Sequence, residues 1–357
     1  MFDKYLQSIL NRSEKYISYA TNLCNYVASS LEKELPLYAT HSHCTDGGTA
    51  GAMIRYAVPE AAIIPMDYWM INDPNFTPLI EQIPWTGIVD LKPFNKQIID
   101  FWVDHHISAR NSVVNANRIR FDMDGDSGSY QLLLSSFLGS LPQHLVELAV
   151  MTRTTDTAGY TTQPPTTIID DLSDLDLIEL TGEEGKIQNE QRIWLLDDAW
   201  GSTYTLKEHL NLHNYLAKDG FYGISKVLDR VNNLRKGRQE AYDIADDIAV
   251  FPIVAFSFAE DSQDKFTILR RLQTNGVKVA ISLNLTKEGT VKISFRRNRF
   301  LSETENDKIQ VQKIAEKLNG GGHPGAAGAS AENLASALDF ISAWAAEIDL
   351  EFHHVEL

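Results

Sequence analysis

Three consecutive residues, Asp104, His105 and His106, offer a carboxylate and two imidazoles directly after an apolar run. Oxygen and nitrogen donors of this kind bind divalent metal ions of the hard to borderline class. Adjacent histidines after a strand are also common as ordinary surface or core residues. The chemistry of this tripeptide therefore depends on the residues that the fold brings beside it.

A second stretch that could do chemistry comes much later in the chain. It consists of Gly320, Gly321, Gly322 and His323, followed by further glycines and alanines. Backbone amides in a glycine-rich loop can approach an anion without side-chain clash, and the imidazole could add a hydrogen bond or a stacking surface. The glycines are also compatible with the left-handed stop of a helix that ends near Leu318.

Several candidate ligands come directly after apolar runs of the sequence. His41 follows residues 35–39, Asp90 follows residues 87–89, and Asp104 follows residues 98–103. These runs alternate with helical patterns, which is typical of an α/β fold with a mainly parallel sheet flanked by helices. Because ligands gather at the carboxyl ends of the strands in such a sheet, the three side chains are predicted to share one crevice.

The length and the apolar pattern predict two domains. The chain has 357 residues, and 43% of them are hydrophobic, which is enough for two packed cores. After about residue 249 the apolar spacing changes to a period of two, and a hairpin pattern follows. We predict an α/β domain over residues 1–185, a helical linker over residues 186–247 and a smaller α/β domain over residues 248–357.

Taken in order, these motifs resemble those of the DHH/DHHA1 phosphoesterase superfamily. The segment from His41 to Gly47 is similar to the first motif in its H-x-x-C-x-D-G form, the form of a subgroup that resembles nanoRNases and dinucleotide phosphodiesterases. Asp90 is in the place of the second motif, residues 104–106 of the third, and Asp156 of the fourth. The resemblance implies a DHH domain with the metal site, followed by a DHHA1 domain that binds the substrate.

The resemblance also implies a two-metal mechanism with two divalent ions, most simply Mn2+, bridged by Asp90. The other implied ligands divide between the ions: His41 on one, and Asp46, His105 and Asp156 on the other. Two cations can clamp a phosphodiester oxygen and lower the pKa of a bridging water. Asp104 and His106 would orient the ligands or carry protons, so the whole third motif, His105 included, is expected to be catalytic.

Cys44 departs from the commoner form of the first motif, which has an aspartate at this position. As a metal ligand, its thiolate would favour a softer ion such as Fe2+ or Zn2+, and Co2+ is a further alternative to Mn2+. A thiol that does not bind would leave the first ion short of an anionic ligand. His43 is an alternative ligand here, and its simpler interpretation is a solvated loop residue.

The second domain supplies the predicted substrate-binding residues. Residues 320–323 resemble the glycine loop of DHHA1 domains, and residues 294–296 resemble their S-x-R element. The fork of Arg296 can hold a phosphate bidentately. Arg297 points to the opposite face if the strand alternates regularly, so it ranks second. The residues expected to bind substrate are therefore Arg296, Gly320, Gly321, Gly322 and His323.

The charge balance argues against wide binding of long nucleic acids. The formal net charge is −16, whereas such binding depends on many phosphate contacts from lysine and arginine. A short anionic substrate remains compatible if metal ions and a local arginine cluster supply positive charge. The sequence has no run of eighteen apolar residues and does not start like a secretory signal. We expect a cytoplasmic protein without membrane contact, and a homodimer is compatible with the sequence.

These inferences predict a metal-dependent phosphodiesterase, an exoribonuclease-type hydrolase that acts on short RNA (nanoRNA). Its substrates would be short oligoribonucleotides or linear signalling dinucleotides such as pGpG and pApA, cleaved to mononucleotides. Two alternatives in the same class are a cyclic-dinucleotide phosphodiesterase and a nucleotide phosphomonoesterase. An alternative of another class is a nucleotide sensor that binds without hydrolysis, and Cys44 in place of a carboxylate motivates it.

Overall fold

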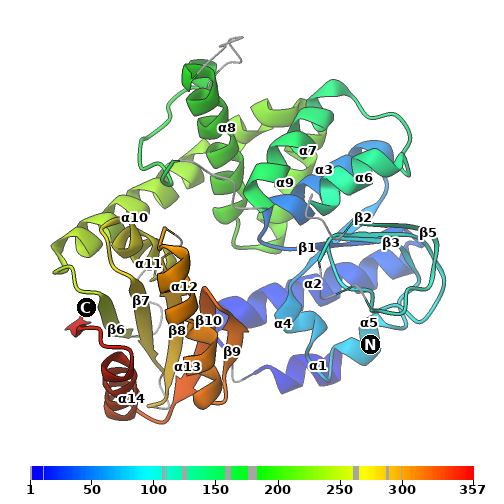
Figure 1. The fold of residues 1–357 in the computed structure, drawn as a ribbon. Coiled ribbons are helices and arrows are strands. Elements are labelled where there is room, and N and C mark those ends of the chain that lie inside the picture. Colours follow the sequence, from blue (N-terminus) through cyan, green and yellow to red (C-terminus); the bar gives the residue numbers. More distant parts are fainter. Residues whose placement is uncertain are drawn as a thin grey trace. The chain divides into compact units, whose positions relative to one another are not determined.

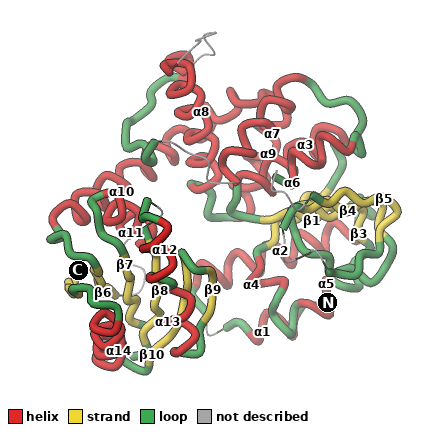
Figure 2. The backbone as a smooth tube through the Cα atoms, in the orientation of Figure 1, coloured by secondary structure: helices red, strands yellow, loops and turns green. Residues whose placement is uncertain are grey.

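The computed structural model describes residues 2–10, 12–106, 109, 111–122, 127–156, 162–175, 183–259, 265–286, 289–298 and 300–357. The chain forms two compact units, residues 1–235 and 236–357, and the division falls inside helix α10 (Leu228–Asp247). In each unit the strands make an inner sheet, and helices lie outside it (Figure 2). No helix in the described ranges is both long and apolar enough to span a bilayer.

The first unit is built on a parallel sheet of five strands in the order β2-β1-β3-β4-β5. The strands are β1 (Leu37–His41), β2 (Ala62–Met66), β3 (Trp85–Val89), β4 (Ile99–Asp104) and β5 (Ala116–Phe121). Strand β2 pairs with one side of β1, and β3, β4 and β5 follow in order on the other side. The strand order therefore reverses at β1. The crevice at such a reversal of strand order lies at the carboxyl ends of β1 and β3.

Helices cover both faces of this sheet (Figure 1). One apolar core includes α1 (Asp3–Ser8), α2 (Glu14–Glu32), α4 (Tyr68–Ile71) and α5 (Thr77–Ile80). The other includes α3 (Thr45–Ala57), α6 (Gly128–Ser135), α7 (Gln143–Asp156), α8 (Glu183–Gly201), α9 (Leu206–Asp219) and two 3-10 turns (Leu172–Leu175, Gly220–Val227). Neighbouring strand residues enter opposite cores, as with Tyr38 and Ala39, because side chains alternate across a strand. The predicted α/β architecture is confirmed.

The helices expected to form a linker over residues 186–247 lie mostly within the first unit. Trp200 of α8 and Leu212 of α9 are fully buried in the same core as Val103 of the sheet. The C-terminal half of α10 packs instead in the second unit, where Ala245 contributes to a core. An amphipathic pattern predicts that a helix has an apolar face, but it does not indicate which surface that face covers.

The second unit has a mixed sheet of six strands in the order β11-β6-β7-β8-β10-β9. The strands are β6 (Ile253–Ala259), β7 (Val279–Leu285), β8 (Val291–Arg297), β9 (Gly321–His323), β10 (Ala326–Ala331) and β11 (Phe352–Glu356). The helices are α11 (Lys265–Thr274), α12 (Glu303–Lys308), α13 (Val311–Lys317) and α14 (Leu334–Glu347). Helices α13 and α14 pack on one face, whereas α11 and the end of α10 pack on the other. The predicted hairpin is β7 and β8, which pair antiparallel.

The predicted glycine-rich loop is largely a strand, which corrects the sequence-based expectation. Gly321–His323 form β9 and pair antiparallel with β10. The left-handed residue after α13 is Asn319, with φ of 56°, because asparagine also tolerates this conformation. Gly320 is required for a different reason: a Cβ there would lie 2.1 Å from the carbonyl oxygen of Gly328.

Candidate metal centre

The carboxyl ends of β1, β3 and β4 bring the predicted ligands together. His41 is the last residue of β1, Asp90 follows β3, and Asp104 ends β4. Two helices complete the cluster, since Asp46 lies in the first turn of α3 and Asp156 ends α7. Within each of three groups, the ligand atoms lie within 4.8 Å of one another: Asp90, Asp104, His105 and His106; His41, Cys44 and Asp90; and Asp46, His105 and Asp156. The groups share members and form one continuous cluster.

Asp90 lies at the centre of this cluster. Its backbone is left-handed, with φ of 59°, and its N–H donates to the carbonyl of Val103 at 3.0 Å. Its carboxylate is buried, with Oδ2 lying 3.5 Å from His41 Nδ1 and Oδ1 lying 3.4 Å from His105 Nε2. Burial alone would raise the pKa of Asp90, but the His105 and His41 imidazoles outweigh it and lower the pKa below its ordinary value. Asp90 is thus an anion shared by the group that contains His41 and the group that contains His105.

In the third group, two further carboxylates, those of Asp46 and Asp156, lie around the imidazole of His105. His105 Nε2 lies 3.5 Å from Asp46 Oδ2 and 3.3 Å from Asp156 Oδ2. Asp46 accepts hydrogen bonds from the N–H groups of Gly128 and Ser129 at the start of α6, at 2.6 and 2.7 Å. Burial, followed by the charges of Asp90 and Asp156, raises the pKa of Asp46. Burial lowers the pKa of His105, but the surrounding carboxylates outweigh it and raise the pKa to about 9.

Three buried ligand atoms lack a hydrogen-bond partner within the described part of the chain: Asp90 Oδ1, Asp104 Oδ2 and His105 Nε2. Buried polar atoms are normally paired, and converging carboxylates repel one another without a counter-charge. Divalent cations would supply both the missing contacts and the missing charge. Because the donors are carboxylate oxygens and imidazole nitrogens, the residues present fit ions such as Mn2+.

Asp104 and His106 form a pair at the edge of the cluster. Asp104 Oδ1 lies 2.7 Å from His106 Nδ1 and also accepts the backbone N–H groups of His105 and His106 at 2.8 and 3.2 Å. The hydrogen bond with Asp104 raises the pKa of His106. A carboxylate on Nδ1 places the proton there and leaves Nε2 as the nitrogen that can exchange a proton or bind an ion.

Cys44 has two contacts that explain its place beside Asp90. Its sulfur caps α3 by accepting the N–H of Gly47 at 3.1 Å, and it lies 3.3 Å from Asp90 Oδ2, to which the thiol donates. Burial, followed by the charges of Asp90 and Asp46, raises the pKa of the thiol well above its usual value. The thiol is therefore protonated at neutral pH while no ion is bound, and binding an ion through sulfur would require the loss of that proton.

His43 lies away from the cluster, so the structure does not support it as a substitute ligand. Its backbone is left-handed, with φ of 55°, and its ring packs against those of Tyr19 and His209, at 5.5 and 4.6 Å between centroids. His209 Nε2 accepts the N–H of His43 at 3.4 Å and contacts Thr203 Oγ1 at 3.1 Å, while Nδ1 faces the carbonyl of Thr205. His209 therefore supports the segment between His41 and Cys44.

Replacing His209 with alanine is expected to weaken Mn2+ binding about tenfold, the lower end of the effect of removing a group that orients metal ligands. The reason is that the His43 backbone loses its partner in the middle of the first motif. Isothermal titration with Mn2+ measures the change. His144→Ala is a matched control, because His144 contacts the carbonyl of Ala217 rather than this segment. Equal affinities of the two variants would contradict a positioning role for His209.

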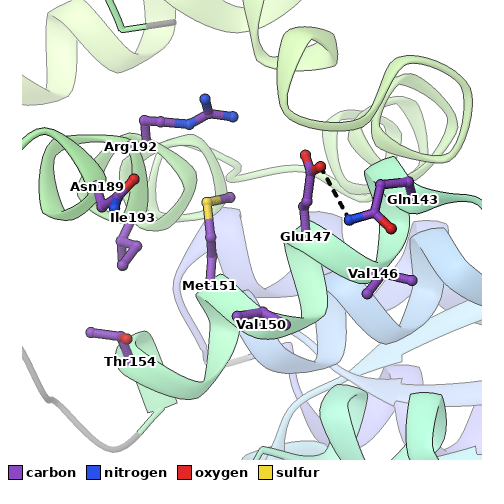
Figure 3. Close-up of a pocket in the computed structure, with 9 residues that line it drawn as sticks. All are labelled: Gln143, Val146, Glu147, Val150, Met151, Thr154, Asn189, Arg192 and Ile193. Atoms are coloured by element: carbon purple, nitrogen blue, oxygen red, sulfur yellow. Dashed lines mark hydrogen bonds between the residues drawn. The ribbon is translucent and has the colours of Figure 1, made fainter. Parts of the chain in front are cut away.

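A pocket of about 400 Å3 lies between α7 and α8 (Figure 3). Apolar side chains such as Val150, Met151 and Ile193 line it, with Glu147 and Arg192 as its charged residues. None of the predicted metal ligands lines this pocket. It consequently offers an apolar surface but no arrangement of groups suited to hydrolysis.

In the second unit, the predicted substrate-binding residues fall on neighbouring strands. Arg296 on β8 pairs with Ala326 on β10, and Ala326 also pairs with His323 on β9. The glycine stretch and the S-x-R element are therefore two strands apart in one sheet. The side chain of His323 is outside the described residues. Arg297 donates to the carbonyls of Asn306 and Ile309 at 2.7 and 2.9 Å, which is a structural role beside α12.

Comparisons with known proteins agree with this architecture. The family model of the DHHA1 domain matches residues 252–347, inside the second unit. No curated protein sequence matches the chain. Sequence and fold together thus define a protein with a DHHA1 domain after a parallel α/β unit. The DHHA1 match covers the part of the chain where the motifs predict a DHHA1 domain.

Several solved structures share the fold at low sequence identity. The pGpG-specific phosphodiesterase PggH from Vibrio cholerae is 15% identical, with a TM-score of 0.53 over 88% of this chain and 99% of PggH. An exonuclease RecJ bound to manganese is 16% identical, with a TM-score of 0.51 over 92% and 94% of the two chains. RecJ from Thermus thermophilus in complex with Mn2+ is 14% identical, with a TM-score of 0.53 over 94% of this chain and 56% of RecJ.

Proposed function

We propose that the protein is a metal-dependent phosphodiesterase that hydrolyses short oligoribonucleotides or linear dinucleotides, such as pGpG and pApA, to mononucleotides. The observation that carries this proposal is the cluster of buried carboxylates and imidazoles that meets at Asp90. The similarity to PggH and to manganese-bound RecJ supports the same reaction class. The net charge of −16 favours a short substrate over a long nucleic acid.

Each residue of the cluster has a role in this proposal. His41 and Cys44 would hold one ion together with Asp90, while Asp46, His105 and Asp156 would hold a second, Mn2+ being the ion that the donors suit best. Bound ions of this kind polarise a phosphoryl oxygen and acidify water. The N–H groups of the α6 start keep Asp46 oriented toward His105.

The Asp104–His106 pair would handle protons during hydrolysis. Asp104 holds His106 in one orientation and stabilises its protonated form. The nitrogen left free, Nε2, can give a proton to the leaving oxygen or take one from an attacking water. A positioned acid or base of this kind contributes about a hundredfold or more to a rate.

The decisive experiment is turnover of 5′-phosphorylated RNA dinucleotides by metal-stripped protein, with and without added Mn2+. We expect mononucleotide release only with the metal, and a loss of about a hundredfold or more in the His106→Ala variant. His144→Ala, on a histidine outside the cluster, is the matched control. A protein that binds Mn2+ but leaves dinucleotides intact would contradict the proposal. Cyclic dinucleotides and nucleotide phosphomonoesters, assayed in parallel, would then identify an alternative substrate or point to a nucleotide sensor.

A further inference from the structure

One face of the second sheet is polar over β8 although the opposite face is a packed core. Ile293 and Phe295 of β8 enter the core beneath α13 and α14. The alternate residues Lys292, Ser294 and Arg296 point to the other face, as side chains alternate along a strand. In the neighbouring strand β7, their paired residues are Asn284, Ser282 and Ala280, respectively. Helix α11 covers the adjoining part of this face with apolar side chains, but the strip over β8 stays polar.

Two buried polar atoms on this strip have no partner within the described part of the chain. They are Ser282 Oγ and Asn284 Oδ1, and Ser282 is only 1% exposed. A buried hydroxyl without a hydrogen bond is unfavourable in an isolated protein. The strip is therefore equipped to bind a further polar group.

Three cationic side chains gather at the same place. Arg296 and Lys292 come from β8, and Lys265 is the first residue of α11. Burial lowers the pKa of Lys265, and the positive charges of Lys292 and Arg296, both of which act on its ammonium group, lower it further. Within the described residues, no ion pair to a carboxylate holds any of the three. Like charges that converge in this way favour an anionic ligand.

An exposed aromatic ring completes the group. Phe266 is 56% exposed, and its ring centroid lies 5.8 Å from the guanidinium carbon of Arg296 and 5.0 Å from Lys265 Nζ. Both cations lie over this ring, and its exposed part offers a flat apolar surface on which a base can stack, while the cations suit a phosphate. A phosphate group beside a flat base is the chemistry of a nucleotide.

We propose that Phe266, Lys265 and Lys292 form, with Arg296, a nucleotide-binding subsite in which the base stacks on Phe266 and the cations hold the phosphate. Ser282 and Asn284 supply polar contacts at its floor. This proposal rests on the proposed function, because it assigns the substrate's nucleotide unit to this face. It adds five residues to the arginine that the sequence motif indicates.

The test compares Phe266→Leu, which keeps an apolar side chain but removes the ring, with Phe266→Tyr, which keeps the ring. Isothermal titration of the Mn2+-loaded protein with AMP should show affinity reduced roughly 5- to 150-fold in Phe266→Leu, the change that corresponds to about 1–3 kcal/mol of base stacking. Phe266→Tyr should bind AMP like the wild type. Analysis of the solution in the calorimeter cell after the titration checks that AMP is intact.

Ribose 5-phosphate separates the two parts of the subsite, since it has the phosphate but no base. Its affinity should be unchanged in Phe266→Leu and reduced in the double variant Lys265→Ala, Lys292→Ala. Equal binding of AMP by the wild type and Phe266→Leu would overturn the stacking role. Unchanged binding of both probes by the double lysine variant would overturn the phosphate role.

Steady-state kinetics with pGpG then distinguishes failure of the subsite from failure of the proposed function. If both are right, Phe266→Leu raises KM and leaves kcat unchanged. Turnover with an unaltered KM would overturn the subsite and leave the phosphodiesterase intact. Binding of AMP that depends on Phe266, without any turnover of dinucleotides, would support the subsite and overturn the proposed function.

Discussion

Replacing Asp90 with alanine is expected to reduce dinucleotide turnover to below about 1% of the wild-type rate, while the protein stays folded. Asp90 belongs to two of the three ligand groups, and both of its carboxylate oxygens face imidazoles. Removing a residue that merely orients a ligand costs about 10–100-fold, so loss of a shared ligand costs more. Asp90→Asn is a second variant that keeps the left-handed backbone favourable, since asparagine tolerates positive φ.

The matched control for Asp90 is Asp67→Ala. Asp67 follows β2 as Asp90 follows β3, but its Oδ1 accepts the N–H of Trp69 and caps α4. Loss of this cap should cost about 0.5–2 kcal/mol of stability and leave turnover near the wild-type value. Initial rates with saturating Mn2+, together with thermal unfolding of each variant, measure both effects. An active Asp90→Asn variant would contradict the shared-ligand assignment.

The position of the cluster was predictable from the sequence because parallel strands place their carboxyl ends at one edge. His41, Asp90 and Asp104 each follow or end an apolar run, and the structure brings all three to the crevice beside β1 and β3. The pattern needs no knowledge of packing, because a single edge of one sheet collects the side chains. Cys44 and Asp46 follow for a related reason: they lie at the start of the helix that β1 leads into.

Other features were not predictable because they depend on which surfaces meet. His209 lies 166 residues after His43 in the chain, and only the packing of α9 within the first unit brings it to that segment. Its sequence signal is weak, since one histidine on an amphipathic helix is usually a core residue. Strand β5 was also missed, because Arg118 and Arg120 interrupt its apolar pattern. Charged residues on a strand at the edge of a sheet protect it from further pairing.

In the second unit too, the sequence pattern predicts some features, while others depend on which surfaces meet. The alternation of β7 and β8 predicts which residues face the core, and Phe295 and Arg296 do point to opposite faces. Phe266 could not be singled out, because its relation to Arg296 arises from where α11 begins over the sheet. The glycines at 320–322 suggest a loop, yet backbone pairing with β10 makes most of them a strand. Tertiary contacts determine both the position of Phe266 beside Arg296 and the strand conformation of these glycines.

Binding of Mn2+ at pH 7 is expected to release at least one proton, mainly from His105. The pKa of His105 is raised to about 9 by the neighbouring carboxylates, after the opposing effect of burial, so its imidazole is protonated at pH 7 in the metal-free protein. An ion can bind this nitrogen only after the proton leaves. The His105 proton should therefore make the apparent affinity for Mn2+ rise about tenfold per pH unit up to about pH 9, where the contribution of this proton levels off.

Isothermal titration in buffers of different ionisation enthalpy counts the protons, because the buffer takes up each one released. The number should fall by about one in His105→Ala, and the proton of the Cys44 thiol, whose pKa burial and the charges of Asp90 and Asp46 raise well above its usual value, would remain in the count if the sulfur binds the ion. His144→Ala should release as many protons as the wild type. An observed heat that does not depend on the buffer would mean that the ion binds without displacing a proton, and His105 would then lose its place as a ligand.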